Sequence, residues 1–185
     1  MSYIVISKTY EPFRNIATEE YCLGLAADSS CPVLYLWQNK NCVVIGKNQN
    51  PWAECNLKAM EEDGVRLIRR KTGGGAVYHD IGNLNYSFCM PRGIYSEEKQ
   101  YGIIISALGA CGICGRLSGR NDIIVDNKKV SGSAFLHSGK ASLHHGTLLV
   151  SSDLSVFSKY LTPPSDKLEA KGIKAFGPCA DAAII

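Results

Sequence analysis

Residues 69–80 read Arg-Arg-Lys-Thr-Gly-Gly-Gly-Ala-Val-Tyr-His-Asp, so three basic side chains precede three glycines and an apolar, aromatic run. Glycine permits backbone conformations with φ > 0 and lets a ligand approach the chain closely. Successive N–H groups in such a turn can surround an anion, and an arginine beside them adds a fork of donors. The stretch therefore predicts a phosphate-binding turn between two buried strands, with a Gly-rich hairpin as the alternative. It matches neither GxxxxGK[ST] nor GxGxxG.

The bulk composition fits one catalytic domain spanning residues 1–185. The formal net charge is +3, which is too small to argue for a nucleic-acid partner. No apolar run reaches the roughly 18 residues that a membrane span needs, so no membrane association is expected. The first residues suggest a strand rather than a signal or transit peptide. We therefore expect a cytoplasmic location, with a mitochondrial or related organelle left open.

The eight cysteines and the histidines do not predict a metal site. Several cysteines lie in apolar runs, where a free thiol behaves as a small core residue, so a reducing compartment is expected. Cys111 and Cys114 form one CxxC pair, for which packing near a helix end is the favoured interpretation. His144 and His145 are adjacent on a predicted strand and therefore point to opposite faces. They cannot easily share one metal ion with each other or with His79.

Hydrophobic periodicity predicts an α+β fold with a mixed or largely antiparallel central sheet flanked by helices. A hairpin is expected from two short apolar runs, residues 33–37 and 42–45, joined by a polar turn. Asn50 and Pro51 predict the start of a helix that continues to about residue 63, where Gly64 ends it. The other expected helices cover about residues 15–27, 101–108 and 154–161. The other expected strands are residues 3–7, 65–69, 76–79, 84–90, 122–126, 130–136 and 142–150.

Residues 70–80 and 82–88 resemble the signature of the lipoate–protein ligase family. Three further blocks resemble the same family in the same order, namely GKNQNPW at 46–52, GRND at 119–122 with KKVSGSA at 128–134, and HHGTLL at 144–149. The resemblance covers about residues 15–173 and implies the fold shared by biotin and lipoate ligases. It also implies the activity: lipoate or octanoate is activated with ATP to lipoyl-AMP, and the acyl group is then transferred to a lysine of an acceptor protein.

The resemblance assigns roles to individual residues, with Lys129 as the essential catalytic lysine. An ammonium on a strand that returns from a tight turn can neutralise both a carboxylate and the α-phosphate. Arg69 is expected to be solvated or paired with a carboxylate. Mg²⁺ is expected to arrive with ATP, and Asp122 is the one protein carboxylate considered for it. The residues implied for ATP and adenylate are Arg70, Gly75, Ala76, Val77, Tyr78, Asn121, Asp122 and Lys129. Those implied for lipoate are Trp37, Gly74, Gly75, His79, Lys129, His145, Gly146 and Thr147.

The implied partners are lipoyl-domain proteins, namely the E2 subunits of 2-oxo acid dehydrogenases and the H protein of glycine cleavage. The sequence departs from the family after residue 173, and the C-terminal accessory domain of many relatives is expected to be absent. A separate accessory subunit is therefore one expected partner. Two alternatives to the ligase stay open. One is an ATP-independent octanoyl or lipoyl transferase that uses Cys179. The other is a non-catalytic lipoate-binding module.

Overall fold

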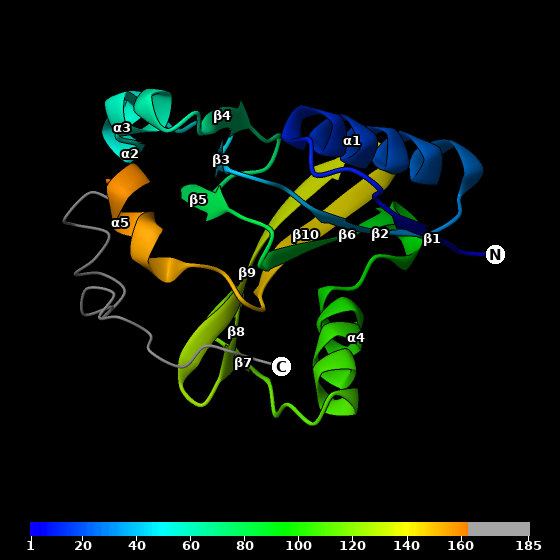
Figure 1. Cartoon of the computed structure of the whole chain (residues 1–185). Helices are drawn as coiled ribbons and strands as arrows, with labels where there is room; N and C mark the ends of the chain where they lie inside the picture. The colour runs from blue at the N-terminus through cyan, green and yellow to red at the C-terminus, as the bar shows by residue number, and fades with distance from the viewer. Residues whose placement is uncertain (163–185) are drawn as a thin grey trace.

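The computed structural model describes residues 1–162, which fold into two β-sheets with helices packed around them (Figure 1). The larger sheet has seven strands in the order β1-β2-β6-β10-β9-β8-β7, and the smaller has three in the order β4-β3-β5. In these orders, the strands are β1 Tyr3–Ile6, β2 Val33–Gln38, β6 Asn83–Pro91, β10 Ala141–Leu149, β9 Lys128–Ser138, β8 Asp122–Val125 and β7 Arg116–Ser118, then β4 Arg66–Arg69, β3 Cys42–Ile45 and β5 Ala76–His79.

The strand pairing confirms the predicted fold class. Only β1–β2 and β3–β4 are parallel among the described pairs, and the other pairs are antiparallel. The helices are α1 Pro12–Ser29, α2 Pro51–Glu54, α3 Leu57–Glu62, α4 Glu97–Ala110 and α5 Phe157–Tyr160, with 3₁₀ turns η1 Arg92–Ile94 and η2 Leu154–Val156. None of the helices within residues 1–162 combines the length and the apolar character that crossing a bilayer requires.

The two long helices cover opposite faces of the larger sheet, as Figure 1 shows. Helix α1 packs its buried side against inward residues of β2, β6 and β10, among them Tyr35, Cys89 and Leu143. Helix α4 packs Tyr101 and Ile104 against the other face. Because successive side chains of a strand alternate between the faces, the central strands β2, β6 and β10 each contribute to both interiors.

Helix α1 begins three residues before the predicted start and continues to Ser29. The carboxylate of Glu11 caps it by accepting a hydrogen bond from the N–H of Arg14, and Pro12 occupies the first turn. Its buried side carries two polar residues, Asn15 and Glu19, which are 0% and 3% exposed. Buried polar groups need hydrogen-bond partners, and both residues find them on the sheet.

The predicted hairpin between residues 33–37 and 42–45 is wrong. Strand β2 pairs with β1 and β6 in the larger sheet, whereas β3 pairs with β4 and β5 in the smaller one. Asn41 adopts φ 48° between the two strands, and the N–H of Lys40 donates to the carbonyl of Tyr10. The connection therefore crosses from one sheet to the other instead of closing a local ladder.

The single helix predicted for residues 50–63 is also wrong, because it is broken at Cys55 and Asn56. Asn50 caps α2 as predicted, but Asn56 then caps a second helix, α3, by accepting from the N–H of Ala59. Cys55 forms an isolated β-bridge with Leu161. The side-chain amide of Asn56 competes with the helical pattern, which is why asparagine favours caps over helix interiors.

The hairpin of β8 and β9 lies slightly earlier than predicted. Its turn residues are Asp126 and Asn127, with φ values of 49° and 62°, and β9 begins at Lys128. Two positive φ angles in a two-residue loop are typical of a type I′ turn, whose twist suits an antiparallel hairpin. Lys129 is therefore the second residue of a long strand. The expectation for Cys179 lies outside the described residues.

Candidate active site

The glycine turn joins β4 to β5 and is held from the inside by Arg70. Its guanidinium donates to the carbonyl oxygens of Gly73 at 2.8 Å, Gly75 at 3.0 Å and Val44 at 2.9 Å. Gly74 has φ 97°, which is accessible to glycine but strained for other residues. The backbone N–H groups of Gly73, Gly74 and Gly75 donate to no backbone carbonyl within residues 1–162. A turn whose carbonyls are fixed inward can direct such N–H groups to an anion.

Arg70 is buried and binds the protein's own backbone. Burial lowers its pKa to about 10, and the nearby carboxylate of Glu19 opposes this shift. The structure therefore gives Arg70 the role of shaping the turn. The direct contact with a nucleotide phosphate that the resemblance implies stays a prediction.

The loop after β3 and the last residue of β4 close around the same turn. A side chain at Gly46 would lie 2.0 Å from the carbonyl oxygen of Gly74, so only glycine fits there. Arg69 donates to the carbonyl oxygens of Gly46, Lys47 and Gln49. Arg69 is exposed to solvent, as expected, and within residues 1–162 its guanidinium binds loop carbonyls rather than a carboxylate.

The turn continues into β5, where Ala76, Val77 and Tyr78 follow Gly75. The ring of Tyr78 packs at 5.2 Å from that of Tyr160 and is buried in the interior of the smaller sheet. The side chain of Tyr78 therefore belongs to the core, so a ligand at the turn would meet the backbone of this residue. The carboxylate of Glu54 lies 3.6 Å from the position of a side chain at Gly75.

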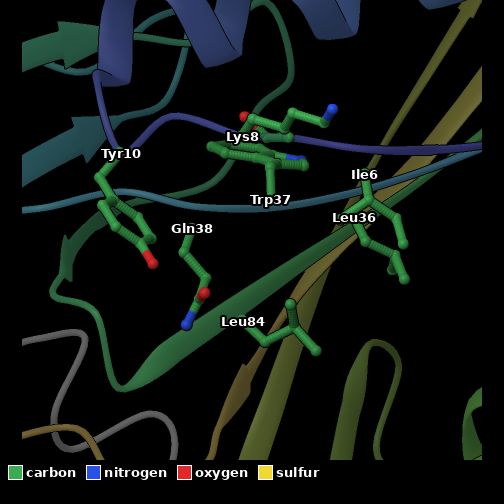
Figure 2. A pocket seen from close by; sticks show the side chains of 8 residues that line it. Ile6, Lys8, Tyr10, Leu36, Trp37, Gln38 and Leu84 are labelled. Atoms are coloured by element: carbon green, nitrogen blue, oxygen red, sulfur yellow. The ribbon is translucent and has the colours of Figure 1, made fainter.

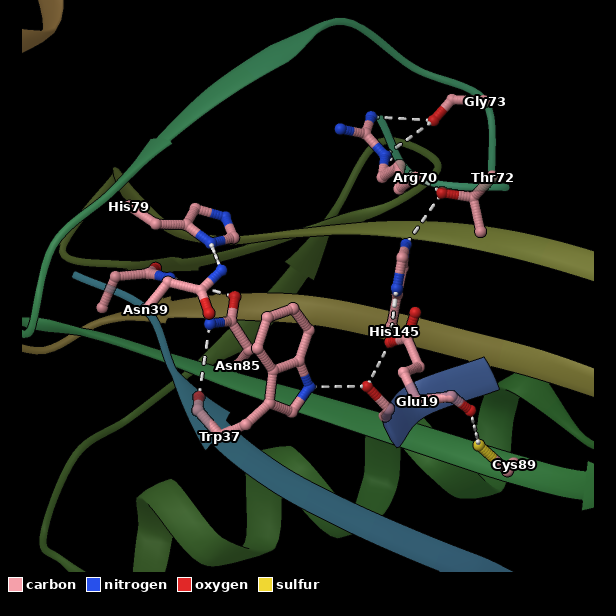
Figure 3. A network of polar contacts seen from close by, with 12 residues as sticks. Glu19, Trp37, Asn39, Arg70, Thr72, Gly73, His79, Asn85, Cys89 and His145 are labelled. Atoms are coloured by element: carbon pink, nitrogen blue, oxygen red, sulfur yellow. Dashed lines mark hydrogen bonds and ion pairs between the residues drawn. The ribbon is translucent and has the colours of Figure 1, made fainter. Parts of the chain in front are cut away.

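A buried chain of hydrogen bonds connects the glycine turn to the sheet (Figure 3). Arg70 Nε lies 3.0 Å from Thr72 Oγ1, which lies 2.8 Å from His145 Nε2. His145 Nδ1 lies 2.8 Å from Glu19 Oε1. The chain continues from Glu19 through Ser87 to Trp37 and thereby connects three of the predicted site residues, Trp37, Arg70 and His145.

Trp37 and His79 lie side by side at the end of this chain. Trp37 Nε1 donates to Ser87 Oγ at 2.9 Å, and its ring centroid is 6.2 Å from that of His79. His79 Nδ1 accepts from the side-chain amide of Asn39 at 3.2 Å. Burial, with the charges of Arg70 and His145, lowers the pKa of His79 to about 3. A neutral imidazole beside an indole forms an apolar wall, and the expected contact of both residues with lipoate stays a prediction.

His144 faces the opposite side of the sheet from His145, as strand alternation predicted. Its Nδ1 lies 2.9 Å from Gln100 Oε1 on α4, and its ring is 4.7 Å from both Tyr101 and Phe135. Burial lowers its pKa to about 3. His144 is therefore a core residue, and the described residues contain no group of three or more potential metal ligands.

Packing requires a glycine at position 146, for a reason that the sequence did not reveal. A side chain there would lie 2.3 Å from the hydroxyl of Tyr86 and 3.0 Å from the carbonyl oxygen of Gly132. That hydroxyl is held by Ser131 and Ser133 at 3.2 and 3.0 Å. On this face the close approach to Gly146 is made by Tyr86, so the expected passage of an acyl chain there is not needed to explain the glycine.

Lys129 lies on the same face of the larger sheet as the glycine turn. Its Nζ lies 2.8 Å from Asp122 Oδ1 and 3.2 Å from the position of a side chain at Gly132. Gly132 neighbours Ser133, which pairs with Gly146, so Gly132 projects to the face of Thr147 and His145. His145 binds Thr72 of the turn on this face.

Two further predicted residues belong to this hairpin. The side-chain amide of Asn121 donates to the carbonyl of Ser133 at 2.9 Å, so it braces the hairpin. The N–H of Gly132 donates to Thr147 Oγ1 at 3.4 Å. Asp122 is paired with Lys129, and its predicted contact with a nucleotide or Mg²⁺ stays untested.

A separate pocket of about 210 Å³ lies at the β1–β2–β6 end of the larger sheet (Figure 2). Leu36 and Leu84 line it together with Ile6, Lys8 and Tyr10. Leu36 belongs to the interior beneath α4, on the opposite face from Glu19 and His145. Of the residues predicted to bind ligand, only Trp37 borders this pocket, so it is distinct from the site at the glycine turn.

Sequence reasoning missed Glu19 and Thr72. Glu19 lies in an amphipathic helix, where a glutamate normally faces solvent. The available signal was its place on the apolar side of that helix, three residues after Ile16 and three before Cys22. Thr72 stands between three basic residues and three glycines, and the phosphate-binding interpretation rested on those residues alone.

Comparison with known proteins places these features in a family. Residues 11–181 match the family model described as the lipoyl protein ligase A/B catalytic domain. A lipoate-protein ligase A from Psychrobacter cryohalolentis is 49% identical over 173 residues, which make up 93% of this chain and 50% of that protein. The chain thus spans half the length of this curated relative.

Three solved structures are similar to this one. The structure titled P. falciparum LipL1 in complex with lipoate has a TM-score of 0.83 at 38% identity, covering 89% of this chain and 52% of that chain. A lipoate-protein ligase A bound with ATP has a TM-score of 0.79 at 26% identity, covering 98% and 80%. A bi-partite lipoate protein ligase from Thermoplasma acidophilum, studied with its E2 lipoyl domain, has a TM-score of 0.73 at 28% identity, covering 92% and 69%. This chain belongs to the lipoyl protein ligase A/B catalytic domain family.

Proposed function

We propose that this chain is the catalytic domain of an ATP-dependent lipoate–protein ligase. It would activate lipoate or octanoate as the acyl adenylate and pass the acyl group to a lysine of a lipoyl-domain protein. The observation that carries the proposal is the position of two complementary groups on one face of the larger sheet. The N–H groups of Gly73, Gly74 and Gly75, which donate to no backbone carbonyl within residues 1–162, form one, and the ammonium of Lys129 is the other. Both would stabilise charge that develops at phosphorus.

In the first step, a carboxylate oxygen of the acid attacks the α-phosphorus of ATP, and pyrophosphate leaves with its electron pair. Two anions must approach each other, so fixed positive charge is required. We assign this role to Lys129, whose ammonium needs no depressed pKa to act as a charge. Mg²⁺ would be carried mainly by the nucleotide phosphates, with Asp122 as the carboxylate beside Lys129 that can supply an oxygen. Its chemistry would be to neutralise the leaving pyrophosphate.

In the second step, the neutral amine of the acceptor lysine attacks the carbonyl carbon of the acyl adenylate. AMP leaves, and the new amide loses the extra proton of the amine. The N–H groups of the glycine turn would bind the AMP phosphate as it leaves, so the same groups would act in both steps. Trp37 and the neutral His79 would contact the acyl chain, because their packed rings present an apolar wall on the same face as His145.

The four buried cysteines, Cys22, Cys42, Cys55 and Cys89, do not favour a thiol-dependent transfer. Burial raises the pKa of Cys42 to about 12 and that of Cys55 to about 11. It also raises the pKa of Cys22 and of Cys89, which lies next to Glu19. The thiolate is the nucleophile, so these thiols are poorly suited to form a thioester at neutral pH. Cys179 lies outside the described residues.

The proposed partners follow from the same relatives. The acceptor would be a lipoyl domain of an E2 subunit or an H protein, as the Thermoplasma ligase was studied with its E2 lipoyl domain. A second unit would assist this domain, as in the Thermoplasma system, which is bi-partite. The seven cysteines within residues 1–162 are free, as a reducing compartment such as the cytoplasm favours.

The decisive experiment separates the two steps. Pyrophosphate release is measured with lipoate and Mg-ATP, and transfer is measured as the mass gain of a lipoyl domain supplied with synthetic lipoyl-AMP. Lys129→Ala should lower pyrophosphate release by about 10²-fold or more, as loss of a group that stabilises developing charge does. Lys128→Ala is the matched control, because Lys128 is the exposed neighbour in the same strand.

The outcomes distinguish the candidate functions. Release and transfer that both depend on Lys129 support the ligase. Transfer from lipoyl-AMP without pyrophosphate release, with or without an accessory subunit, limits the domain to the second half-reaction. Binding of lipoyl-AMP with neither activity, even with an accessory subunit, overturns the proposal and favours a binding module.

A further inference from the structure

We propose that Glu19 is a positioning residue that holds both substrate-binding parts of the site, the glycine turn and Trp37, through two hydrogen-bond chains that end on its carboxylate. This inference rests on the proposed function. The turn chain consists of Arg70, Thr72 and His145, and the indole chain consists of Ser87 and Trp37 (Figure 3).

The direction of the turn chain follows from the chemistry of its ends. A guanidinium can only donate, so Arg70 Nε–H donates to Thr72 Oγ1. Thr72 Oγ1 lies 2.8 Å from His145 Nε2, and the protonation of His145 decides which of the two donates. A carboxylate only accepts, so His145 Nδ1 carries a hydrogen and donates to Glu19 Oε1 at 2.8 Å. The chain therefore runs from the donor Arg70 to the acceptor Glu19.

The indole chain has the same direction. An indole N–H can only donate, so Trp37 Nε1 donates to Ser87 Oγ at 2.9 Å. The hydroxyl of Ser87 then donates to Glu19 Oε1. A carboxylate is an acceptor without hydrogens, so one oxygen of Glu19 completes both chains.

Glu19 is held firmly enough to transmit position. Its side chain is 4% exposed, and that of His145 is 10% exposed. The carboxylate lies on the inner side of α1, an 18-residue helix packed along the sheet. Losing one partner leaves another buried polar group unpaired, which costs more than the bond itself contributes. The arrangement therefore fixes the rotamers of Trp37 and Thr72 in the free protein, before substrates arrive.

The two chains can be cut separately. Thr72→Val keeps the shape of the side chain and removes the hydroxyl that joins Arg70 to His145. Ser87→Ala removes the hydroxyl that joins Trp37 to Glu19. Thr72→Val should raise the KM for ATP about tenfold and leave the KM for lipoate within about twofold, and Ser87→Ala should do the reverse. Tenfold corresponds to about 1.4 kcal/mol, the scale of one hydrogen bond.

Glu19 variants test whether the two chains meet. Glu19→Ala should raise both KM values by about tenfold each. Glu19→Gln should be milder, because the amide keeps an oxygen where Oε1 accepts both hydrogen bonds. It also remains informative if Glu19→Ala does not fold. Glu20→Gln is the matched control, since this neighbour forms only a surface ion pair with Lys71 and should change neither KM.

A second measurement does not depend on activity. Trp52 is 78% exposed and Trp37 is 4% exposed, so Trp52→Phe leaves the buried indole as the single fluorophore among the protein's two tryptophans. In that background, Ser87→Ala and Glu19→Ala should shift the Trp37 emission, whereas Thr72→Val should not. If wild-type protein shows no turnover, the proposed function fails, but this emission pattern still tests the network.

Three results would overturn the inference. One is that folded Glu19 variants lose stability but keep both KM values. Another is that they change the KM of only one substrate. The third is that Glu19→Ala leaves the emission of Trp37 unchanged while Ser87→Ala shifts it.

Discussion

His144 and His145 are neighbours in one strand, yet they belong to different parts of the molecule. His145 faces α1. Its Nδ1 binds Glu19 of that helix, and its Nε2 binds Thr72 of the glycine turn. His144 faces α4, where one nitrogen meets Gln100 and the ring packs among aromatic side chains. The difference shows that the face of the sheet, not the type of residue, decides which histidine belongs to the candidate site.

The two faces of the larger sheet also differ in the side chains that they carry. The face toward α1 carries the hydrogen-bond chains that connect the glycine turn and Trp37 to Glu19, so its groups are fixed for binding. The face toward α4 is an apolar, aromatic interior that includes Tyr86, Phe88 and Tyr101. We therefore expect changes on the α4 face to alter stability and changes on the α1 face to alter substrate binding.

The largest expected effect on the α4 face is that of Gly146→Ala. The new methyl group would collide with the Tyr86 hydroxyl, which two serines hold in place, and we expect a loss of about 3 kcal/mol or more. The free energy of unfolding from urea titration measures this. Gly102→Ala is the control, because a methyl group meets nothing within 4 Å there and should stabilise α4 slightly. Equal stabilities for the two variants would contradict the packing argument.

Acidification is expected to destabilise the protein through one buried histidine from each face. The pKa of His79 and that of His144 are both lowered to about 3, below the unfolded value of 6.5. Between these values the unfolded chain binds more protons, so stability is complete above pH 6.5 and falls as the pH decreases toward 3. The two groups together give a slope of about 2.7 kcal/mol per pH unit.

Denaturant titrations at pH 6.5, 5.5 and 4.5 measure this slope. His144→Ala should remove about half of the histidine contribution, because His79 remains. An unchanged slope in that variant would show that His144 is not held neutral by burial.

The smallest expected effect on stability is that of His144→Ala, and His145→Ala is the comparison for activity. Removing the His144 ring from the aromatic interior should lower the free energy of unfolding by about 2 kcal/mol and leave kcat/KM unchanged. His145→Ala should lower kcat/KM by about tenfold or more, since it disconnects the turn from Glu19. Urea titration and pyrophosphate release are measured on both variants. The distinction between the faces is wrong if His144→Ala lowers kcat/KM as strongly as His145→Ala.

Local patterns predicted the elements better than their partners. Strand alternation separated His144 from His145, and the cap of Asn50 with Pro51 predicted the start of α2. The supposed hairpin of β2 and β3 failed because strand pairing depends on distant segments, here Asn83–Pro91 and Ala76–His79. Short apolar runs do not encode which sheet they join.

The candidate site was predictable where the chemistry is carried by a local motif. The turn of Gly73, Gly74 and Gly75 and the position of Lys129 on a returning strand were visible in the sequence. The inward orientation of Arg70, the bracing by Arg69 and the burial of Glu19 were not. These features depend on backbone carbonyls and side chains that only the folded chain brings together.

Helix α1 touches the sheet at two polar points one turn apart. Asn15 binds the carbonyl of Gln38 at 2.8 Å and the side chain of Asn39 at 3.0 Å, while Glu19 reaches β6 and β10. These two contacts fix both the rotation of the helix about its axis and its position along that axis. One extra residue between Asn15 and Glu19 would rotate Glu19 by about 100° around the helix relative to Asn15. The four-residue spacing between Asn15 and Glu19 is therefore what lets one helix face make both contacts.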